Sequence, residues 1–282
     1  MSNLKEIVMG RAFGRVIRNI PYAREGALRG VGDLFLPHGR ARGAPVLLIH
    51  GGGWNALDKT DFEFLLPVLA LAGRPVFNIN YRYLSQAAWP ACGEDTVAAG
   101  KFLLAGGLAE YGLTARDKIL ICGASAGGHL AMMTGLNLSP ERVEAIVSMA
   151  GPCRIDWHAQ NLDPTGNRKN FLPLFFGRDI ALNDPLVAQA SPIFVLAKLG
   201  HVPPRLFCLH SSNDTLCPPI YSTEAVSAWK RAGGTAEVDF IDGDGMLHGF
   251  WVNDDRESAV LRPDILIFFA RVFDALNAKI DK

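Results

Sequence analysis

The chain has 282 residues, of which 49% are hydrophobic and 20% are charged, and its 28 basic side chains balance 28 acidic ones. These values are typical of a soluble globular protein with a substantial core, and they exclude disordered, collagen-like and disulfide-scaffold classes. Because the charges balance, we expect neither nucleic acid nor an anionic membrane as a partner, but a small or neutral molecule.

The apolar segments and the cysteines indicate the cellular compartment in which we expect the protein. Residues 1–20 carry scattered basic side chains and no unbroken apolar core, which argues against a secretory signal, and no stretch approaches the ~20 apolar residues that cross a bilayer. The five cysteines are Cys92, Cys122, Cys153, Cys208 and Cys217. Their odd number disfavours a disulfide framework, and they form no CxxC pair or Cys/His cluster. We therefore expect reduced thiols, a cytoplasmic location and no metal.

Apolar runs of strand length recur along the chain and are separated by segments with helical spacing. The expected strands cover residues 30–37, 45–50, 75–82, 118–125, 143–151, 205–212 and 236–243. The expected helices cover roughly residues 60–72, 90–111, 127–137, 218–232 and 258–277. Several strands are apolar without alternation, which predicts a mostly parallel central sheet flanked by helices. The first strand alternates better and is expected at an antiparallel edge.

Residues 152–200 depart from this alternation. The segment holds five prolines and scattered aromatic residues, and connections longer than about 15 residues are usually functional. We expect a single domain over residues 1–282 with this segment as a small cap insertion over one end of the sheet. The aromatic residues Trp157, Phe171, Phe175 and Phe176 could line a substrate pocket, but packing within the cap is favoured for any one of them.

The segment 123–128 reads GASAGG and follows an apolar strand, with helical spacing after it. This is G-x-S-x-G in the strand–turn–helix context of a nucleophile elbow, where glycines permit a strained turn that exposes the serine hydroxyl. A serine that merely caps the helix would give the same letters, but the flanking strand and helix favour a nucleophile. Ser125 is therefore the candidate nucleophile.

A serine nucleophile needs a base, and the base needs a group that fixes its tautomer. The elbow fold supplies them in the order Ser, Asp or Glu, His. Asp214 follows the strand at 205–212, and His248 lies in a loop between the last strand and the last helix. We expect these two as acid and base, whereas Asp242 and Asp244 could merely form the turn before the histidine.

The sequence HGGGW at 50–54 follows the strand at 45–50. In an acyl-transfer site the oxyanion is held by the N–H after the nucleophile, here that of Ala126, and by N–H groups of a glycine-rich loop after an earlier strand. Gly52 and Gly53 are the candidate donors of that loop. A phosphate site would need G-x-G-x-x-G or a P-loop lysine, and neither follows. His50 is interpreted as a brace for the loop.

These motifs resemble the α/β-hydrolase fold of the hormone-sensitive-lipase-like esterase group. The resemblance rests on HGGGW (50–54), NYRYLSQAAWPACGED (80–95), GASAGGHLA (123–131), HSSND (210–214) and LHGF (247–250). HGGGW also fits the HGGxW signature of arylformamidases. One motif departs from the group, because its usual YRLAPE reads YRYLSQ at 81–86 and lacks the glutamate.

The resemblance and the residues together predict a serine carboxylesterase for small to medium acyl esters, without a cofactor. An arylformamidase on the same fold and triad is the alternative, because the two activities share every step and differ in leaving group and acyl size. A non-catalytic ligand receptor is disfavoured because all three triad residues are present. A homodimer is compatible with the sequence.

Overall fold

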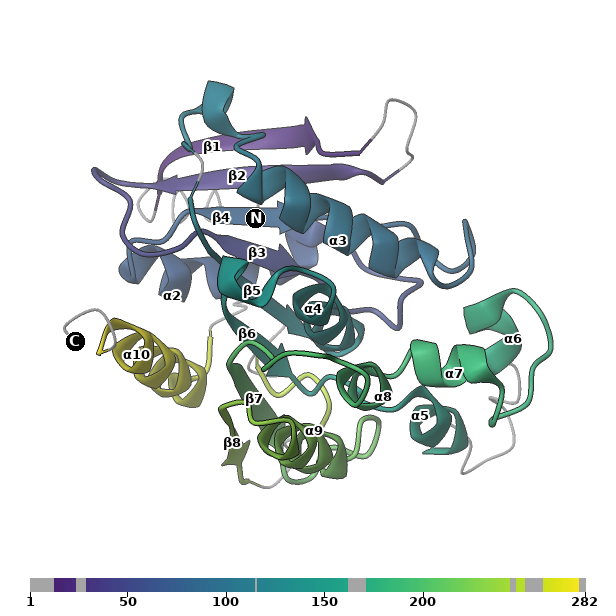
Figure 1. The fold of residues 1–282 in the computed structure, drawn as a ribbon. Helices are drawn as coiled ribbons and strands as arrows, with labels where there is room; N and C mark the ends of the chain where they lie inside the picture. Colours follow the sequence, from purple (N-terminus) through teal and green to yellow (C-terminus); the bar gives the residue numbers. More distant parts are fainter. Residues whose placement is uncertain are drawn as a thin grey trace.

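The described residues form a sheet of eight strands, in the order β1-β2-β4-β3-β5-β6-β7-β8 (Figure 1). The computed structural model describes residues 13–23, 29–114, 116–161, 171–243, 247–251 and 261–278. The strands are β1 (Phe13–Pro21), β2 (Val31–Pro37), β3 (Val46–Ile49), β4 (Val76–Ile79), β5 (Ile119–Ala124), β6 (Val143–Met149), β7 (Leu206–Ser211) and β8 (Ala236–Ile241). The strands β3 to β8 are parallel to one another, whereas β1 and β2 are antiparallel to their neighbours. The predicted α/β-hydrolase sheet is confirmed.

The edge of the sheet differs from the prediction. The first predicted strand is β2, which is antiparallel as expected, but β1 covers it and forms the edge. The residues of β1 between its buried ends are exposed or half-buried, and they include Arg15, Arg18 and Asn19. Because an edge strand with one solvated face needs no apolar run, the hydrophobic pattern gave no sign of it.

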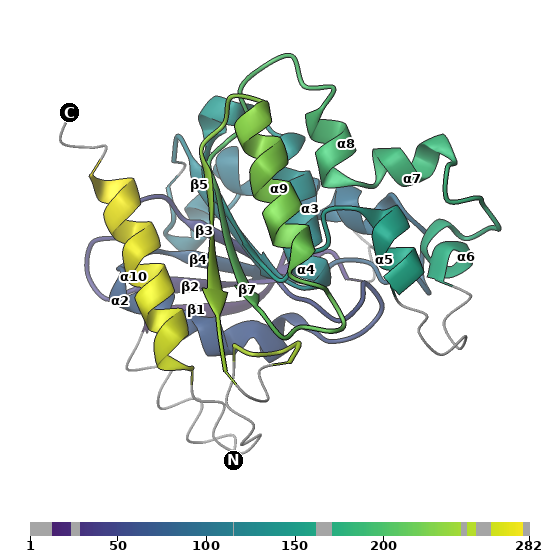
Figure 2. The same cartoon turned by 90° about the horizontal axis from the view of Figure 1, so that it is seen from below.

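Helices cover both faces of the sheet. They are α2 (Leu66–Leu71), α3 (Ala91–Leu104), α4 (Ala126–Leu136), α9 (Ile220–Arg231) and α10 (Pro263–Asn277), with 3-10 turns η1 (Lys59–Leu65), η2 (Ala109–Tyr111) and η3 (Pro140–Arg142). Figure 2 shows α3, α4 and α9 on one side of the sheet and α2 and α10 on the other. Each face therefore has its own helical layer, as an α/β architecture requires.

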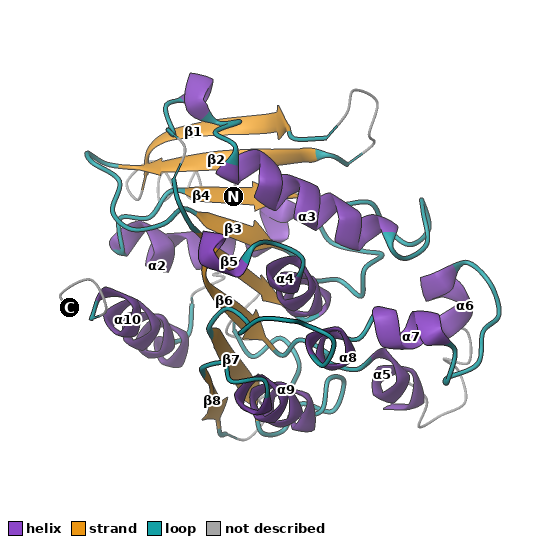
Figure 3. Ribbon diagram, viewed as in Figure 1, coloured by secondary structure: helices purple, strands orange, loops and turns teal. Residues whose placement is uncertain are grey.

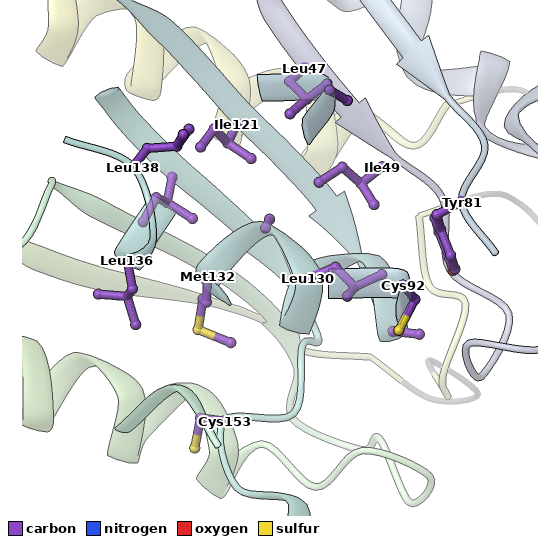
Figure 4. Packing of buried hydrophobic residues seen from close by; sticks show 14 of the residues in the cluster. Leu47, Ile49, Tyr81, Cys92, Ile121, Leu130, Met132, Leu136, Leu138 and Cys153 are labelled. Atoms are coloured by element: carbon purple, nitrogen blue, oxygen red, sulfur yellow. The ribbon is translucent and has the colours of Figure 1, made fainter. Parts of the chain in front are cut away.

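The core divides into two layers because successive side chains of a strand point to opposite faces. Leu47 and Ile49 of β3 belong to the apolar cluster under α3, α4 and α9, whereas Val46 and Leu48 belong to the cluster under α2 and α10. Figure 4 shows the first of these layers, with Leu47, Ile49 and Ile121 near Leu130 and Met132 of α4. Helix α4, which follows the candidate nucleophile, is buried along its whole length.

The helix predicted at 60–72 is divided in two. Its first part is the 3-10 turn η1, and an α-helix begins only at Leu66, with Pro67 in its first turn. Asp58 caps η1 by accepting from the N–H of Thr60, and the carboxylate of Asp61 accepts in return from the N–H of Asp58. The cap is thus a capping box that starts before the predicted boundary.

The described residues of the segment predicted as a cap, 152–161 and 171–200, form four short helices. They are α5 (Ile155–Asn161), α6 (Phe171–Phe176), α7 (Pro185–Gln189) and α8 (Pro192–Leu196). Figure 3 shows them as a group, and in Figures 1 and 2 α5, α6 and α7 lie beyond α8, away from α2 and α10. Phe175 and Phe176 are buried, whereas Trp157 and Phe171 are half-buried. The role of this segment as a cap remains a prediction.

Candidate active site

Ser125 stands at a sharp turn between β5 and α4. Its φ of 55° and ψ of −125° lie where non-glycine residues are strained. The flanking glycines have no room for a side chain: a Cβ at Gly123 would lie 2.2 Å from the carbonyl oxygen of Gly127, and one at Gly127 would lie 2.3 Å from that of Ile49. The G-x-S-x-G spacing is therefore imposed by backbone packed against backbone, as in a nucleophile elbow.

The predicted triad residues are brought together from 123 residues apart. Nε2 of His248 lies 2.9 Å from Oγ of Ser125, and Nδ1 of His248 lies 2.7 Å from Oδ2 of Asp214. The carboxylate can only accept, so Nδ1 carries the proton and Nε2 is left to accept from the serine hydroxyl. Asp214 and His248 follow β7 and β8 at the carboxyl edge of the sheet, the edge at which α/β proteins bind ligands.

Asp214 is buried and held in a fixed orientation. Its Oδ1 accepts from the backbone N–H groups of Leu216, at 3.0 Å, and Cys217, at 2.8 Å. Burial raises the pKa of Asp214, but the contact with His210 and the hydrogen bonds from His248 and the N–H of Cys217 outweigh it and lower the pKa well below the usual range. The carboxylate thus stays ionised while it orients His248.

Cys217 is buried next to Asp214, but its thiol is not a competing nucleophile. Its side chain is 1% exposed, and burial raises the pKa of the thiol well above its usual value. A thiol must ionise before it attacks. Cys217 therefore forms part of the wall beside the serine.

The loop of HGGGW packs against the nucleophile turn. A Cβ at Gly51 would lie 2.8 Å from the carbonyl oxygen of Ala124, and Gly52 and Gly53 have φ of 101° and 58°. Within the described chain, the backbone N–H groups of Gly52, Gly53 and Ala126 donate to no other residue. These are the three groups predicted to hold an oxyanion, and all three remain available for one.

His50 braces this loop, as predicted. Its ring is fully buried and stacks on Tyr81 with 4.3 Å between ring centroids, and its Nδ1 lies 2.7 Å from the carbonyl oxygen of Gly51. The hydroxyl of Tyr81 donates to the carbonyl oxygens of His50 and Gly51. Burial lowers the pKa of His50 to about 4, so the ring is neutral near pH 7.

Trp54 ties the glycine loop to the segment that contains α7 and α8. Its Nε1 donates to Nδ1 of His129 over 3.1 Å, and Nε2 of His129 donates to the carbonyl oxygen of Ala190 over 2.8 Å. Burial lowers the pKa of His129 to about 4. The neutral ring therefore works as a fixed spacer between the loop and Ala190. The Trp54 ring also contacts Phe171 and Phe175.

The other acidic candidates are placed elsewhere or not described. Asp242 is hydrogen-bonded to the hydroxyl of Ser212. Asp244 lies outside the described residues. One neighbour of the site was missed, because His210 was interpreted only as part of a strand, yet its Nε2 lies 3.5 Å from Oδ2 of Asp214. The sequence held one signal for this contact: His210 is a polar residue in an apolar strand and lies four positions before Asp214.

Among the described residues, no group of three or more histidine, cysteine or acidic side chains could hold a metal ion. All five cysteines are buried and unpaired. No helix in the described ranges combines the length and hydropathy needed to cross a bilayer.

The family model described as BD-FAE matches residues 33–229, which include the glycine loop, Ser125 and Asp214. The chain belongs to the BD-FAE family. Two curated relatives of this BD-FAE protein come from Mycobacterium tuberculosis. Esterase LipC is 28% identical over 244 residues, which cover 81% of this chain and 59% of LipC, and esterase LipQ is 30% identical over 220 residues, which cover 74% and 51%. The chain thus matches between half and three fifths of the length of these relatives.

Solved structures give the same fold. A truncated carbohydrate esterase from gut microbiota superposes with a TM-score of 0.77 at 21% identity, over 96% of this BD-FAE protein and 98% of that chain. Together with the sheet order, this confirms the α/β-hydrolase fold that the motifs predicted.

Proposed function

We propose that this chain is a serine carboxylesterase that hydrolyses small to medium acyl esters. The observation that carries the proposal is the unbroken hydrogen-bonded chain from Ser125 through His248 to Asp214 at a nucleophile elbow. The naming of LipC and LipQ as esterases supports it.

The proposed reaction has two steps. Ser125 attacks the ester carbonyl while His248 takes its proton, and the negative charge on the carbonyl oxygen is held by the N–H groups of Gly52, Gly53 and Ala126. Collapse of the tetrahedral intermediate expels the alcohol, which takes the proton from His248. Water then attacks the acyl-enzyme by the same route and releases the acid. Asp214 stays ionised throughout and stabilises the imidazolium.

The preference for short acyl chains is part of the proposal. The four helices in the described residues of the segment 152–200 have five to seven residues each. Phe175 is fully buried there, packed on Trp54 and Trp89. A segment whose aromatic side chain is packed against the rest of the chain leaves little room for a long acyl channel. We also propose a cytoplasmic location, which the five unpaired thiols support.

The arylformamidase alternative is disfavoured by Trp54. The tryptophan of HGGGW is the feature that points to formamides, but its ring is 1% exposed and its N–H is used by His129. Packing alone accounts for it. An aniline is also a poorer leaving group than an aryl alcohol.

The test is a panel of aryl esters from acetyl to decanoyl together with formanilide, with Ser125→Ala as control. Each buried methylene adds about 0.8 kcal/mol of binding while room remains, and overpacking then reverses the gain. kcat/KM should therefore rise to about butanoyl and fall clearly by decanoyl. A fluorophosphonate should label Ser125 alone. If formanilide exceeded the best ester in kcat/KM, the arylformamidase would replace the carboxylesterase.

A further inference from the structure

His210 of β7 is a buried histidine that contacts the acid of the proposed triad. Its ring is fully buried, with Nε2 2.7 Å from the carbonyl oxygen of Cys217 and 3.5 Å from Oδ2 of Asp214. Its Nδ1 lies 2.7 Å from Oγ of Ser222 on α9. Contacts at both ring nitrogens hold the imidazole in one orientation.

These partners decide where the proton lies. The carbonyl oxygen of Cys217 can only accept, so Nε2 carries the proton, and in the neutral ring Nδ1 accepts from the hydroxyl of Ser222. The Nε2–H is hydrogen-bonded to the carbonyl of Cys217, and Oδ2 of Asp214 lies 3.5 Å from the same nitrogen. Oδ2 of Asp214 is therefore near two imidazole rings, at 3.5 Å from Nε2 of His210 and 2.7 Å from Nδ1 of His248.

His210 also fixes the loop that presents the acid. The loop runs from Asp214 to Cys217 and is closed by the N–H of Cys217, which donates to Oδ1 over 2.8 Å. His210 contacts both ends of this loop, through the carbonyl of Cys217 and through Oδ2. A ring on the rigid strand β7 thereby sets the position of a carboxylate on a loop.

We infer that His210 is a positioning residue of the proposed triad, whose Nε2–H orients the Asp214 carboxylate toward His248 and shares its negative charge. The inference rests on the proposed function. The tautomer and orientation of His248 depend on a well-placed carboxylate. The contact with His210 comes first among those that lower the pKa of Asp214 against the larger, opposing effect of burial.

The test uses two amides that differ in reach. Glutamine at position 210 places its side-chain N–H near the place of Nε2, whereas asparagine reaches only to the place of Nδ1. We expect His210→Gln to keep kcat within about threefold of wild type and His210→Asn to lose about tenfold or more, since hydrogen bonds to charged groups are among the strong ones. In the Asp214→Asn background the two variants should have equal kcat, because the charged partner is gone.

The pH profile separates positioning from packing. Without His210, the Asp214 carboxylate has no second imidazole N–H near it and becomes a stronger acceptor for His248. A stronger acceptor stabilises the protonated form of His248. His248 acts as base in its neutral form, so the acid limb of kcat/KM should move to higher pH in His210→Asn and stay in place in His210→Gln. Leu206→Ala is the matched control, since Leu206 is fully buried on the same strand and face. It should lower the Tm but leave kcat and the acid limb unchanged.

The outcomes are distinguishable. If Ser125→Ala keeps activity, the proposed function itself fails. If Ser125→Ala is inactive but the glutamine and asparagine variants share one kcat and one acid limb, the role of His210 alone is overturned. Should His210→Asn fail to fold, Ser222→Ala removes the partner of Nδ1 and should move the acid limb in the same direction, and an unmoved limb would overturn the inference.

Discussion

Replacing Gly52 by alanine should disable the oxyanion loop without touching the triad. Gly52 has a φ of 101°, and a Cβ there would lie 2.0 Å from the carbonyl oxygen of Ala56 and 2.6 Å from its carbon. Both atoms are backbone, so no side chain can turn aside. The N–H groups of Asn55 and Ala56 donate to the carbonyl of Gly52 over 3.1 and 2.9 Å. The new methyl group must therefore open this turn.

The size of the effect follows from the groups that the turn carries. Gly52 and Gly53 supply two of the three proposed oxyanion donors, and removing one donor typically costs about 10² to 10³ in kcat, or roughly 3 to 4 kcal/mol. The donors act on charge that develops in the transition state. We expect Gly52→Ala to lower kcat for an aryl butanoate by about 10² to 10³ and to change KM by less than about threefold.

Gly39→Ala is the control for backbone strain. Gly39 also has a positive φ, 71°, but no atom lies within 4 Å of the position of its Cβ, and it lies between β2 and β3. The left-handed conformation should cost it about 1 to 2 kcal/mol of stability. Steady-state kinetics with a thermal melt of each variant make the comparison. If Gly52→Ala kept kcat within tenfold of wild type, or if Gly39→Ala lost as much, the loop would not hold the donors as proposed.

Three other predictions address the triad and the buried histidines. Ser125→Ala and His248→Ala should each lower ester turnover by about 10⁶, with the double variant scarcely worse, and more than a tenth of wild-type turnover in either folded variant would contradict the roles of these residues. Asp214→Asn should lower kcat by about 10⁴ by loss of the histidine tautomer, while Asp242→Asn stays near wild type; the reverse order would move the acid into the histidine loop. Burial lowers the pKa of His129 to about 4 from 6.5, so between these values the unfolded chain binds a proton that the native state does not, and stability must fall as the pH falls. Denaturant titrations at pH 7 and pH 5 should show a loss of about 2 kcal/mol from this residue that is absent in His129→Gln, and an equal loss in both proteins would refute the assignment.

The parts of the fold that were predicted correctly are those that strong local patterns encode. The strands β3, β5 and β7 are fully buried, so each appears as an apolar run. Ser125 was identifiable because its turn needs glycines two residues before and after it. Asp214 and His248 were identifiable because they follow strands in the order that the fold requires.

The parts that were missed depend on contacts between distant residues. Arg18 of β1 is hydrogen-bonded to Asp33 and Glu63. Polar side chains such as Arg18, which by themselves suggest a loop, can therefore belong to an edge strand because they find partners there. The contact of His210 with Asp214 depends on how the loop after β7 folds back, which no periodicity encodes. Sequence patterns show which face of a strand is buried, but not which polar group meets another there.

The packing around the glycines of the nucleophile turn determines whether a second substitution can compensate for their replacement. At Gly123 and Gly127 the atoms that exclude a side chain are backbone carbonyls, so an alanine at either position can be relieved by no second substitution. Gly135 of α4 is also tightly packed, but the atom 2.4 Å from its Cβ position is Cδ1 of Ile146. Its Cγ1 lies 2.7 Å from the same position, so a change that removes both atoms, as in Ile146→Ala, would make room. A selection for revertants should thus recover compensating changes for Gly135→Ala, whereas from Gly123→Ala and Gly127→Ala it should recover only the original glycine.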